Sequence, residues 1–202
     1  MRFIYSILLG FALLTLACHK DTPSTDPIIN PPPPSPTQTE YIPIYNACDT
    51  SVGKAYALKS TKRWLAGALC RSYKSNGEDS WLVELTTCSS EGYIREFMGF
   101  GPIPDNNPVK KYMVRKVSSS TVKGAVNSSY STLSQDGDVL EDYYYPDTTD
   151  VENFVEIVRW DTLNKQAEGR FHISFNIKEP RWNPINPHKV TFSSGRFWLK
   201  LP

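Results

Sequence analysis

Side chains that could bind a metal or carry out catalysis form one closely spaced group. Four carboxylates fall within seven residues, at Asp136, Asp138, Glu141 and Asp142. Carboxylate oxygens are ligands that Ca²⁺ prefers, but this run lacks the alternating ligands and the terminal Glu of an EF-hand loop. The Asp-Gly-Asp sequence instead predicts a turn with its acidic side chains in solvent. We therefore expect no metal site here.

The other reactive side chains do not form a recognisable catalytic set. Of the three histidines, His19 precedes the folded body, His172 lies on the polar face of a predicted strand and His188 lies in a proline-rich loop. Ser193-Ser194-Gly195 lacks both the Gly-x-Ser-x-Gly pattern and the following helix of a nucleophile elbow. We expect no catalysis and no cofactor, and a carbohydrate-active hydrolase is the least favoured hypothesis.

One cysteine, Cys18, is placed for lipid attachment. It follows an apolar run, residues 3–14, which is shorter than the roughly 20 residues of a membrane-spanning helix. Leu14-Thr15-Leu16-Ala17-Cys18 resembles the lipobox of bacterial lipoproteins, with Leu16 where a small residue is usual. The resemblance implies a signal peptide over residues 1–17 and a lipid-modified Cys18 that holds the protein on the outer membrane.

Two alternatives to this interpretation are an ordinary secretory signal and an uncut N-terminal anchor helix. His19-Lys20-Asp21 partly resembles the signal that sends some Bacteroidota lipoproteins to the cell surface, although Thr22 replaces the usual second acid. This favours a surface-facing over a periplasmic position. Residues 19–40 contain seven prolines interleaved with Ser, Thr and Asp, which is typical of an extended linker without a core.

From residue 41 onward the pattern is that of β-strands. Residues 169–177 alternate apolar and polar side chains, and Gly169-Arg170-Phe171 returns near the end as Gly195-Arg196-Phe197. A bulge at residues 193–195 would bring Val190 and Phe192 onto the same side as Phe197 and Leu199. Further strands are predicted at residues 52–58 (or a short helical turn), 64–73, 81–88, 93–100, 111–117, 122–133, 139–145 and 151–160, with a loop from Gly101 to Pro108.

These segments predict the organisation of the whole chain. Residues 1–17 are the signal peptide, residues 18–40 are the lipidated cysteine and disordered proline-rich linker, and residues 41–202 are one globular domain. The fold class is all-β, a single β-sandwich or β-barrel of about eight or nine mostly antiparallel strands.

The carboxy-terminal third resembles a family of Bacteroidota lipoproteins of unknown function. In this family a strand that ends in Asp, here Asp161, leads to a Gly-x-Phe strand, and the chain closes on a Gly-Arg-Phe strand. Trp64-Leu65-Ala66 is similar to an early Trp-x-Ala in the same family. The resemblance implies an all-β fold and an envelope location, and it implies no catalytic residues.

Cys48, Cys70 and Cys88 belong to the folded body, so at least one thiol stays unpaired. A two-residue turn at Asn76-Gly77 would place Cys70 opposite Val83 and on the other face from Cys88. That register disfavours a Cys70–Cys88 bridge and leaves pairing of Cys48 with either cysteine open.

Aromatic side chains are the best candidates for ligand contact. Trp182 lies in a loop, and the Tyr143-Tyr144-Tyr145 run must turn at least one ring outward unless another layer covers it. Trp182 and Tyr144 could therefore contact a glycan or a protein, or Trp182 could instead cover an open end of the core. The formal net charge of +1 gives no reason to expect nucleic acid. We expect a non-catalytic binding or adhesion module on the membrane, with a structural envelope protein as the alternative.

Overall fold

The computed structural model describes residues 43–75, 77–116 and 124–202, and in these ranges the regular structure consists of strands. The predicted signal peptide, Cys18, the linker, Asn76 and parts of two predicted strands, residues 117 and 122–123, lie outside the described residues. No helix in the described part of the chain is long and apolar enough to cross a membrane.

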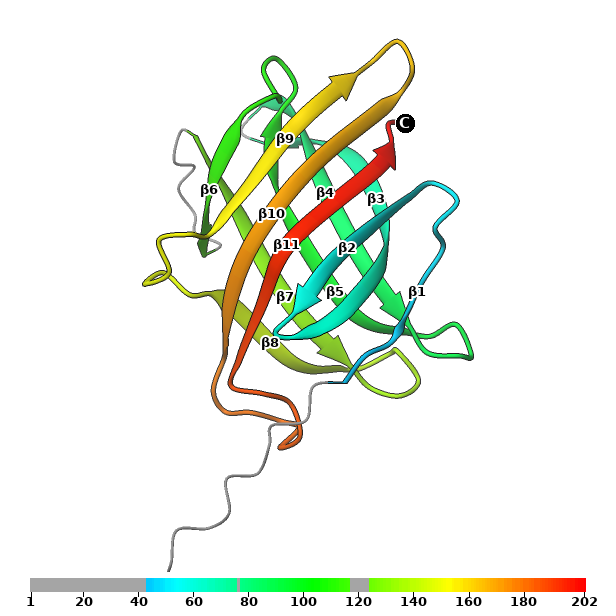
Figure 1. Cartoon of the computed structure of the whole chain (residues 1–202), viewed down its shortest axis with the longest axis vertical. Coiled ribbons are helices and arrows are strands. Elements are labelled where there is room, and N and C mark those ends of the chain that lie inside the picture. The colour runs from blue at the N-terminus through cyan, green and yellow to red at the C-terminus, as the bar shows by residue number, and fades with distance from the viewer. Residues whose placement is uncertain (1–42, 76, 117–123) are drawn as a thin grey trace, which may run out of the picture. The chain divides into compact units, whose positions relative to one another are not determined.

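In the described part of the chain eleven strands follow one another, and Figure 1 shows their arrangement. Their bounds are β1 Asn46–Ala47, β2 Gly53–Lys59, β3 Lys62–Ser75, β4 Glu78–Cys88, β5 Ile94–Pro104, β6 Lys111–Lys116, β7 Ala125–Leu133, β8 Leu140–Pro146, β9 Phe154–Asp161, β10 Gln166–Ile177 and β11 Lys189–Lys200.

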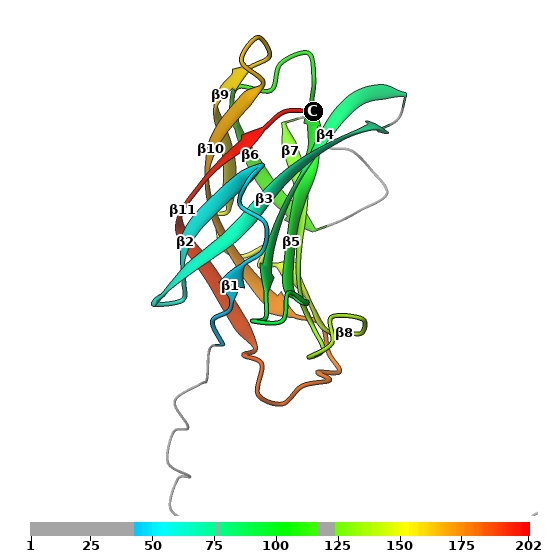
Figure 2. The ribbon, with the colours of Figure 1, turned by 90° about the vertical axis from the view of Figure 1, so that its right-hand side faces the viewer.

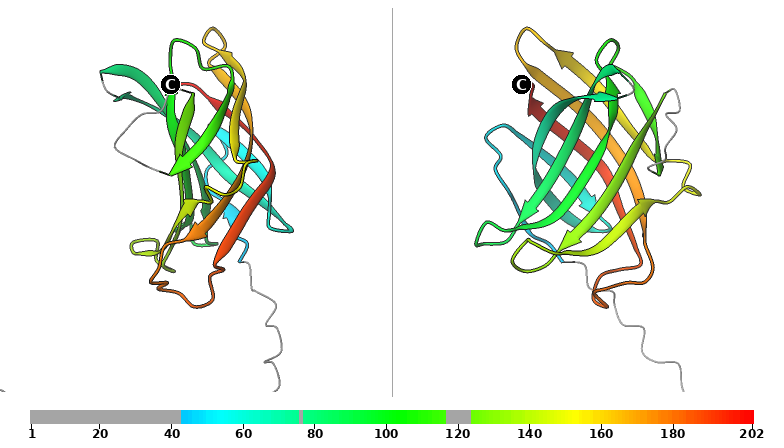
Figure 3. Two further views of the ribbon diagram at one scale, coloured as in Figure 1. Left: turned by 90° about the vertical axis from the view of Figure 1, so that its left-hand side faces the viewer. Right: turned by 180° about the vertical axis from the view of Figure 1, so that it is seen from behind.

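Nine of these strands form a closed barrel, as Figures 1 and 3 show from the front and from behind. Around the ring the order is β2, β3, β4, β5, β7, β6, β9, β10, β11 and back to β2. Among the described strands only β6 and β7 pair in parallel. The predicted all-β, mostly antiparallel domain is therefore confirmed, and it is a closed barrel.

β8 fills the ring at one end of the barrel. The first part of β10 pairs with β9, whereas its last residues, Phe175–Ile177, pair with β8. β8 also pairs with the end of β7, so it bridges β7 and β10 where β6 and β9 do not reach. We call this the entry end, because the described chain starts there, beside the β2–β3, β4–β5, β7–β8 and β10–β11 connections (Figure 2), and its first residue, Pro43, is bound by Lys59 at the end of β2.

The two Gly-Arg-Phe segments pair with each other across β10 and β11. Gly169 lies opposite Phe197, and Phe171 lies opposite Gly195. Each ring covers the glycine of the other strand: a Cβ on Gly195 would lie 2.6 Å from the Phe171 ring, and one on Gly169 would collide with the Phe197 ring. The repeated motif thus packs two large rings side by side inside the barrel because each faces a residue without a side chain.

The predicted bulge near the end of the chain is confirmed. The pairing of β11 with β10 shifts register between Phe171 and Ile173, and Ser194 adopts a positive φ of 53°. The extra residue changes the phase of β11, so Val190 and Phe192 before it and Phe197 and Leu199 after it all lie in the core.

Two cysteines form the disulfide Cys48–Cys88, which ties β1 to the end of β4. Cys70 is opposite Val83, as the predicted turn requires, and its thiol is buried and free. Burial, with a smaller effect of Glu84, raises the pKa of the Cys70 thiol to about 12. This thiol is therefore protonated and unreactive at neutral pH.

The other predicted strand boundaries that fall on described residues differ from the observed ones by three residues or fewer, but the predicted end of β5 is wrong by four. β5 does not end at Phe100 but continues to Pro104, with Ile103 opposite Trp81. Pro102 is tolerated in the strand because the β4–β5 ladder shifts register there, between Trp81 and Val83, and Pro104 is tolerated as the last residue of β5, beyond the residues that pair with β7.

Candidate binding groove and the loop that carries Trp182

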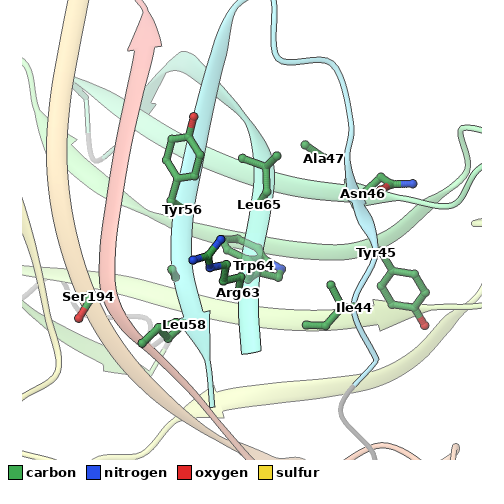
Figure 4. Close-up of a pocket in the computed structure, with 11 residues that line it drawn as sticks. Ile44, Tyr45, Asn46, Ala47, Tyr56, Leu58, Arg63, Trp64, Leu65 and Ser194 are labelled. Carbon is green, nitrogen blue, oxygen red and sulfur yellow. The ribbon is translucent and has the colours of Figure 1, made fainter. Parts of the chain in front are cut away.

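The sheet divides at the entry end, between β3 and β4. Pairing of these two strands starts at Gly67 and Thr86, so the first residues of β3, Lys62–Ala66, pair with β2 alone among the described strands. β1 lies beside the end of β4 instead, where Asn46 and Ala47 pair with Cys88 and Thr87. A groove remains between β1 on one side and β2 and β3 on the other (Figure 4).

Covalent and steric constraints fix the walls of this groove. The Cys48–Cys88 disulfide holds the chain just after β1 to β4. Asp49 then crosses directly over Gly67 of β3, where a Cβ would lie only 2.5 Å from the Asp49 carbonyl oxygen. The groove is thus closed where the chain passes over Gly67.

Large apolar side chains line the groove, whose volume is about 580 Å³. Tyr56 of β2, which is 48% exposed, lies next to Leu65 of β3, while Ile44 points toward β3 from the other wall (Figure 4). The remaining lining residues are Tyr45, Asn46, Ala47, Ala57, Leu58, Arg63, Trp64 and Ser194. A contiguous apolar hollow on a protein surface is typical of a binding site.

Beneath the groove lies a buried carboxylate, Glu96 of β5. Its Oε2 accepts hydrogen bonds from Trp64 Nε1 at 2.9 Å and from Thr87 Oγ1 at 2.7 Å. Its Oε1 accepts from Tyr130 OH at 2.7 Å and from the buried ammonium of Lys59. Four donors from four strands therefore satisfy one carboxylate that is closed off from solvent.

The same cluster positions the groove. Lys59 Nζ also donates to the Pro43 carbonyl at 2.9 Å, which fixes the segment that leads into Ile44. The Trp64 indole lines the groove and donates to Glu96. Burial, and secondarily the Glu96 carboxylate, holds the pKa of Tyr130 well above its usual value, so its hydroxyl remains a donor.

A second buried carboxylate, Asp142 of β8, holds the β10–β11 loop. Its Oδ1 accepts from the Trp182 backbone N–H at 2.7 Å, and its Oδ2 accepts from Asn183 N at 3.2 Å and Asn186 Nδ2 at 2.7 Å. Arg181 Nη1 closes the loop by donating to the Asn186 carbonyl at 2.9 Å. Trp182 itself is 80% exposed. The loop is therefore fastened to the barrel while its indole faces solvent.

The residues proposed from sequence for ligand contact lie in different environments. Trp182 is exposed, as proposed, and does not cover the core. Tyr144 is fully buried and donates to the Pro187 carbonyl at 2.9 Å, so it is not available to a ligand at the surface. Tyr143 and Tyr145 face outward instead and pack against each other. Cys18 lies outside the described residues.

The acidic residues at 136–142 have two separate environments: Asp136 lies in a turn, and Asp142 binds the β10–β11 loop. Asp136 bonds to Ser134 and to the Asp138 N–H within the turn, and these hydrogen bonds lower its pKa. Asp142 points the other way and is occupied by the loop. In the described residues no group of three or more His, Cys, Asp or Glu is placed to hold a metal ion.

Sequence reasoning missed the groove. In β2 the inward positions carry Ala55 and Ala57, whereas the larger Tyr56 and Leu58 lie outside. The small inward residues leave room for the rings of Trp64 and Phe192, which pack edge to face. Alanines that alternate with large apolar residues were the available signal for an apolar outer face.

Comparisons with protein-family models, with curated proteins and with solved structures gave no match.

Proposed function

We propose that this protein is a lipid-anchored component of the cell envelope whose barrel is a non-catalytic binding module. Its ligand is an extended segment of a partner protein, which occupies the groove between β1 and β3. The observation that supports this most directly is the edge of Arg63–Ala66, which pairs only with β2 among the described strands and lies beside an apolar hollow.

An open strand edge next to apolar hollows suits a peptide better than a sugar. An extended peptide can add to such an edge through main-chain hydrogen bonds, while alternate side chains enter the adjoining hollow. Ile44, Leu58 and Leu65 are aliphatic, and they offer burial to apolar side chains but no hydrogen bonds to sugar hydroxyls. Tyr56 is the one lining residue of β2 or β3 with an exposed aromatic ring.

The lining of the groove also supports a non-catalytic binding role. Among the described residues that line it, the polar side chains are Tyr45, Asn46, Tyr56, Arg63 and Ser194, which include no carboxylate, imidazole or thiol. A hydroxyl without a general base beside it is a weak nucleophile. The proposal therefore contains no catalytic step.

Peptide selection tests the ligand class. A library of displayed ten-residue linear peptides is selected on the chain from residue 18 with Cys18→Ser, and hydrogen exchange is measured with the best peptide bound. We expect slower exchange of amides in Lys62–Ala66. We also expect about tenfold weaker binding in Leu65→Ser, because a large apolar contact is lost.

The matched control is Met113→Ser, which alters an exposed apolar residue of β6 outside the groove. Equal binding by Leu65→Ser and the parent, or protection elsewhere in the barrel, would overturn the peptide proposal. Retention on a glycan array that Tyr56→Ala abolishes would replace the peptide by a sugar. If neither peptides nor glycans are retained, the structural envelope role is favoured.

The lipid anchor has its own test. Cells that express the protein are labelled with a fatty-acid probe, and we expect the label to be lost in Cys18→Ala. A labelled alanine variant would contradict the anchor at Cys18.

A further inference from the structure

We propose that the entry end of the barrel lies against the surface of a lipid bilayer. This inference rests on the proposed anchoring through Cys18, but it concerns a different surface from the groove. Three connections at the entry end, β4–β5, β7–β8 and β10–β11, carry the relevant side chains (Figures 1 and 2).

Each of these connections has large exposed apolar side chains within it or at the first strand residue that follows it. They are Tyr93 and Ile94 on the first, Val139 and Leu140 on the second, and Trp182 and Ile185 on the third. Trp182 is the most exposed of the five tryptophans. Exposed apolar groups on neighbouring connections form one contact surface rather than scattered exceptions.

The loops are held together, so the surface is rigid. Gly137 of the β7–β8 turn packs on the backbone of Ile94, where a Cβ would lie 3.1 Å from the Ile94 carbonyl oxygen. Asp142, near the start of β8, holds the β10–β11 loop through the Trp182 and Asn183 amides. A rigid surface loses little conformational entropy when it binds.

The position of the chain entry selects lipid as the partner. Pro43 lies at this same end, where Lys59 Nζ binds its carbonyl. The 26 residues from Cys18 to Pro43 reach at most about 90 Å when fully extended. A barrel confined within that distance of the membrane meets it at about millimolar effective concentration, so weak contacts suffice for docking.

The side-chain chemistry fits the interface of a bilayer. Trp and Tyr prefer the headgroup region, where the ring is in an apolar environment and its polar atom in a wet one. Charges of both signs lie near these apolar side chains: Glu91 and Arg95 at the β4–β5 connection, Asp136 and Asp138 in the β7–β8 turn, and Lys178, Glu179 and Arg181 in the β10–β11 loop. This mixture gives no net attraction to anionic lipid, so zwitterionic vesicles are the appropriate probe.

Vesicle flotation tests the proposal. Every strand of the barrel starts at Asn46 or later, so the chain from residue 18 with Cys18→Ser retains all of them. This protein is mixed with phosphatidylcholine–phosphatidylethanolamine vesicles, and the floating fraction is measured. We expect Trp182→Ala to lower the partition coefficient about tenfold and Leu140→Ser to lower it about threefold.

Leu163→Ser is the matched control, because Leu163 is 94% exposed in the β9–β10 turn at the opposite end. Its partition coefficient should equal that of the parent. Equal flotation of the parent, Trp182→Ala and Leu163→Ser would overturn the proposal, and so would an absence of flotation in the parent.

Quenching by brominated lipid gives a second readout. We expect bromine in the acyl chain near the headgroup to quench the tryptophan fluorescence of the parent and not that of Trp182→Phe, which retains an apolar ring and still floats. Unchanged quenching in Trp182→Phe would contradict the proposed orientation. Both readouts use unacylated protein, so a failure of the Cys18 anchor, seen as lost fatty-acid labelling, is distinguishable from a failure of docking.

Discussion

Two carboxylates buried at the entry end, Glu96 and Asp142, both accept hydrogen bonds but stabilise different parts of the molecule. Each is 1% exposed or less and accepts several hydrogen bonds. Glu96 is bound by side chains of β2, β3, β4 and β7, so it joins strands of the barrel. Asp142 is bound mainly by the backbone and one amide of a single loop, so it fixes how Trp182 is presented.

We therefore expect substitution of Glu96 to destabilise the whole barrel and substitution of Asp142 to affect only the β10–β11 loop. Removal of the Glu96 charge leaves the Lys59 ammonium buried without a counterion, whereas removal of the Asp142 charge frees amides that can reach water when the loop opens. The donors decide this difference, because burial of the two carboxylates is the same.

The largest effect is expected for Glu96→Gln. An uncompensated buried charge costs about 3–5 kcal/mol, so the free energy of unfolding in urea should fall by that amount. Lys59→Met together with Glu96→Gln should recover part of the loss, because no charge then remains buried and the glutamine amide oxygen still accepts from some of the remaining donors, Trp64, Thr87 and Tyr130. A Glu96→Gln variant as stable as the parent would show that the network contributes little to the barrel.

A smaller, local effect is expected for Asp142→Asn. The amide cannot accept from all three donors, and each unsatisfied group costs about 1–3 kcal/mol. Hydrogen exchange should speed up at the Trp182 and Asn183 amides while the β3–β4 amides keep their parent rates. Faster exchange throughout the barrel would erase the distinction between the two carboxylates.

A third carboxylate, Asp147, should make the free energy of unfolding depend on pH. Hydrogen bonds from Lys189 and Thr149 hold its pKa well below the usual range. A folded-state pKa below the unfolded value stabilises the protein above about pH 4, and this stabilisation is lost as the pH falls further. Urea unfolding at pH 5 and pH 2.5 should therefore show a smaller acid loss in Asp147→Asn than in the parent. An equal loss would mean that the contact with Lys189 does not survive in solution.

The smallest effect on stability is expected for Trp182→Ala. An exposed side chain without a structural role changes the free energy of unfolding by no more than about 0.5 kcal/mol. Thermal unfolding of this variant should overlay that of the parent. A clear loss of stability would show that the Trp182 side chain helps Asp142 to hold the loop, and this would contradict a role of Trp182 in membrane contact alone.

Features that depend on local pattern could be predicted from sequence. The alternation of apolar and polar residues predicted the strands, and the change in phase of the apolar residues around Gly195 predicted the bulge. Both follow from the two-residue period of a strand. The turn at Gly77 fixed the β3–β4 register and with it the separation of Cys70 from Cys88. The Cys48–Cys88 bridge could not be chosen in the same way, because β1 has only two residues and no pattern of its own.

Features that depend on the meeting of distant strands could not be predicted. Glu96 shares its strand phase with Met98 and Phe100, which was the signal that a charge faces the core. Its donors are nevertheless up to 37 residues away, and the alternation gives no pairing partners. The groove likewise arises only because β1 displaces β3 from β4, which no single segment encodes.

The reciprocal placement of Gly169, Phe171, Gly195 and Phe197 makes the pairing of the last two strands self-correcting. A slip of two residues in one direction would set Phe171 opposite Phe197, and the two rings would compete for one space. The same slip in the other direction would set Gly169 opposite Gly195 and leave a void. A misaligned β10–β11 pair therefore has either a steric clash or a cavity, and in the native register each phenylalanine ring lies over a glycine.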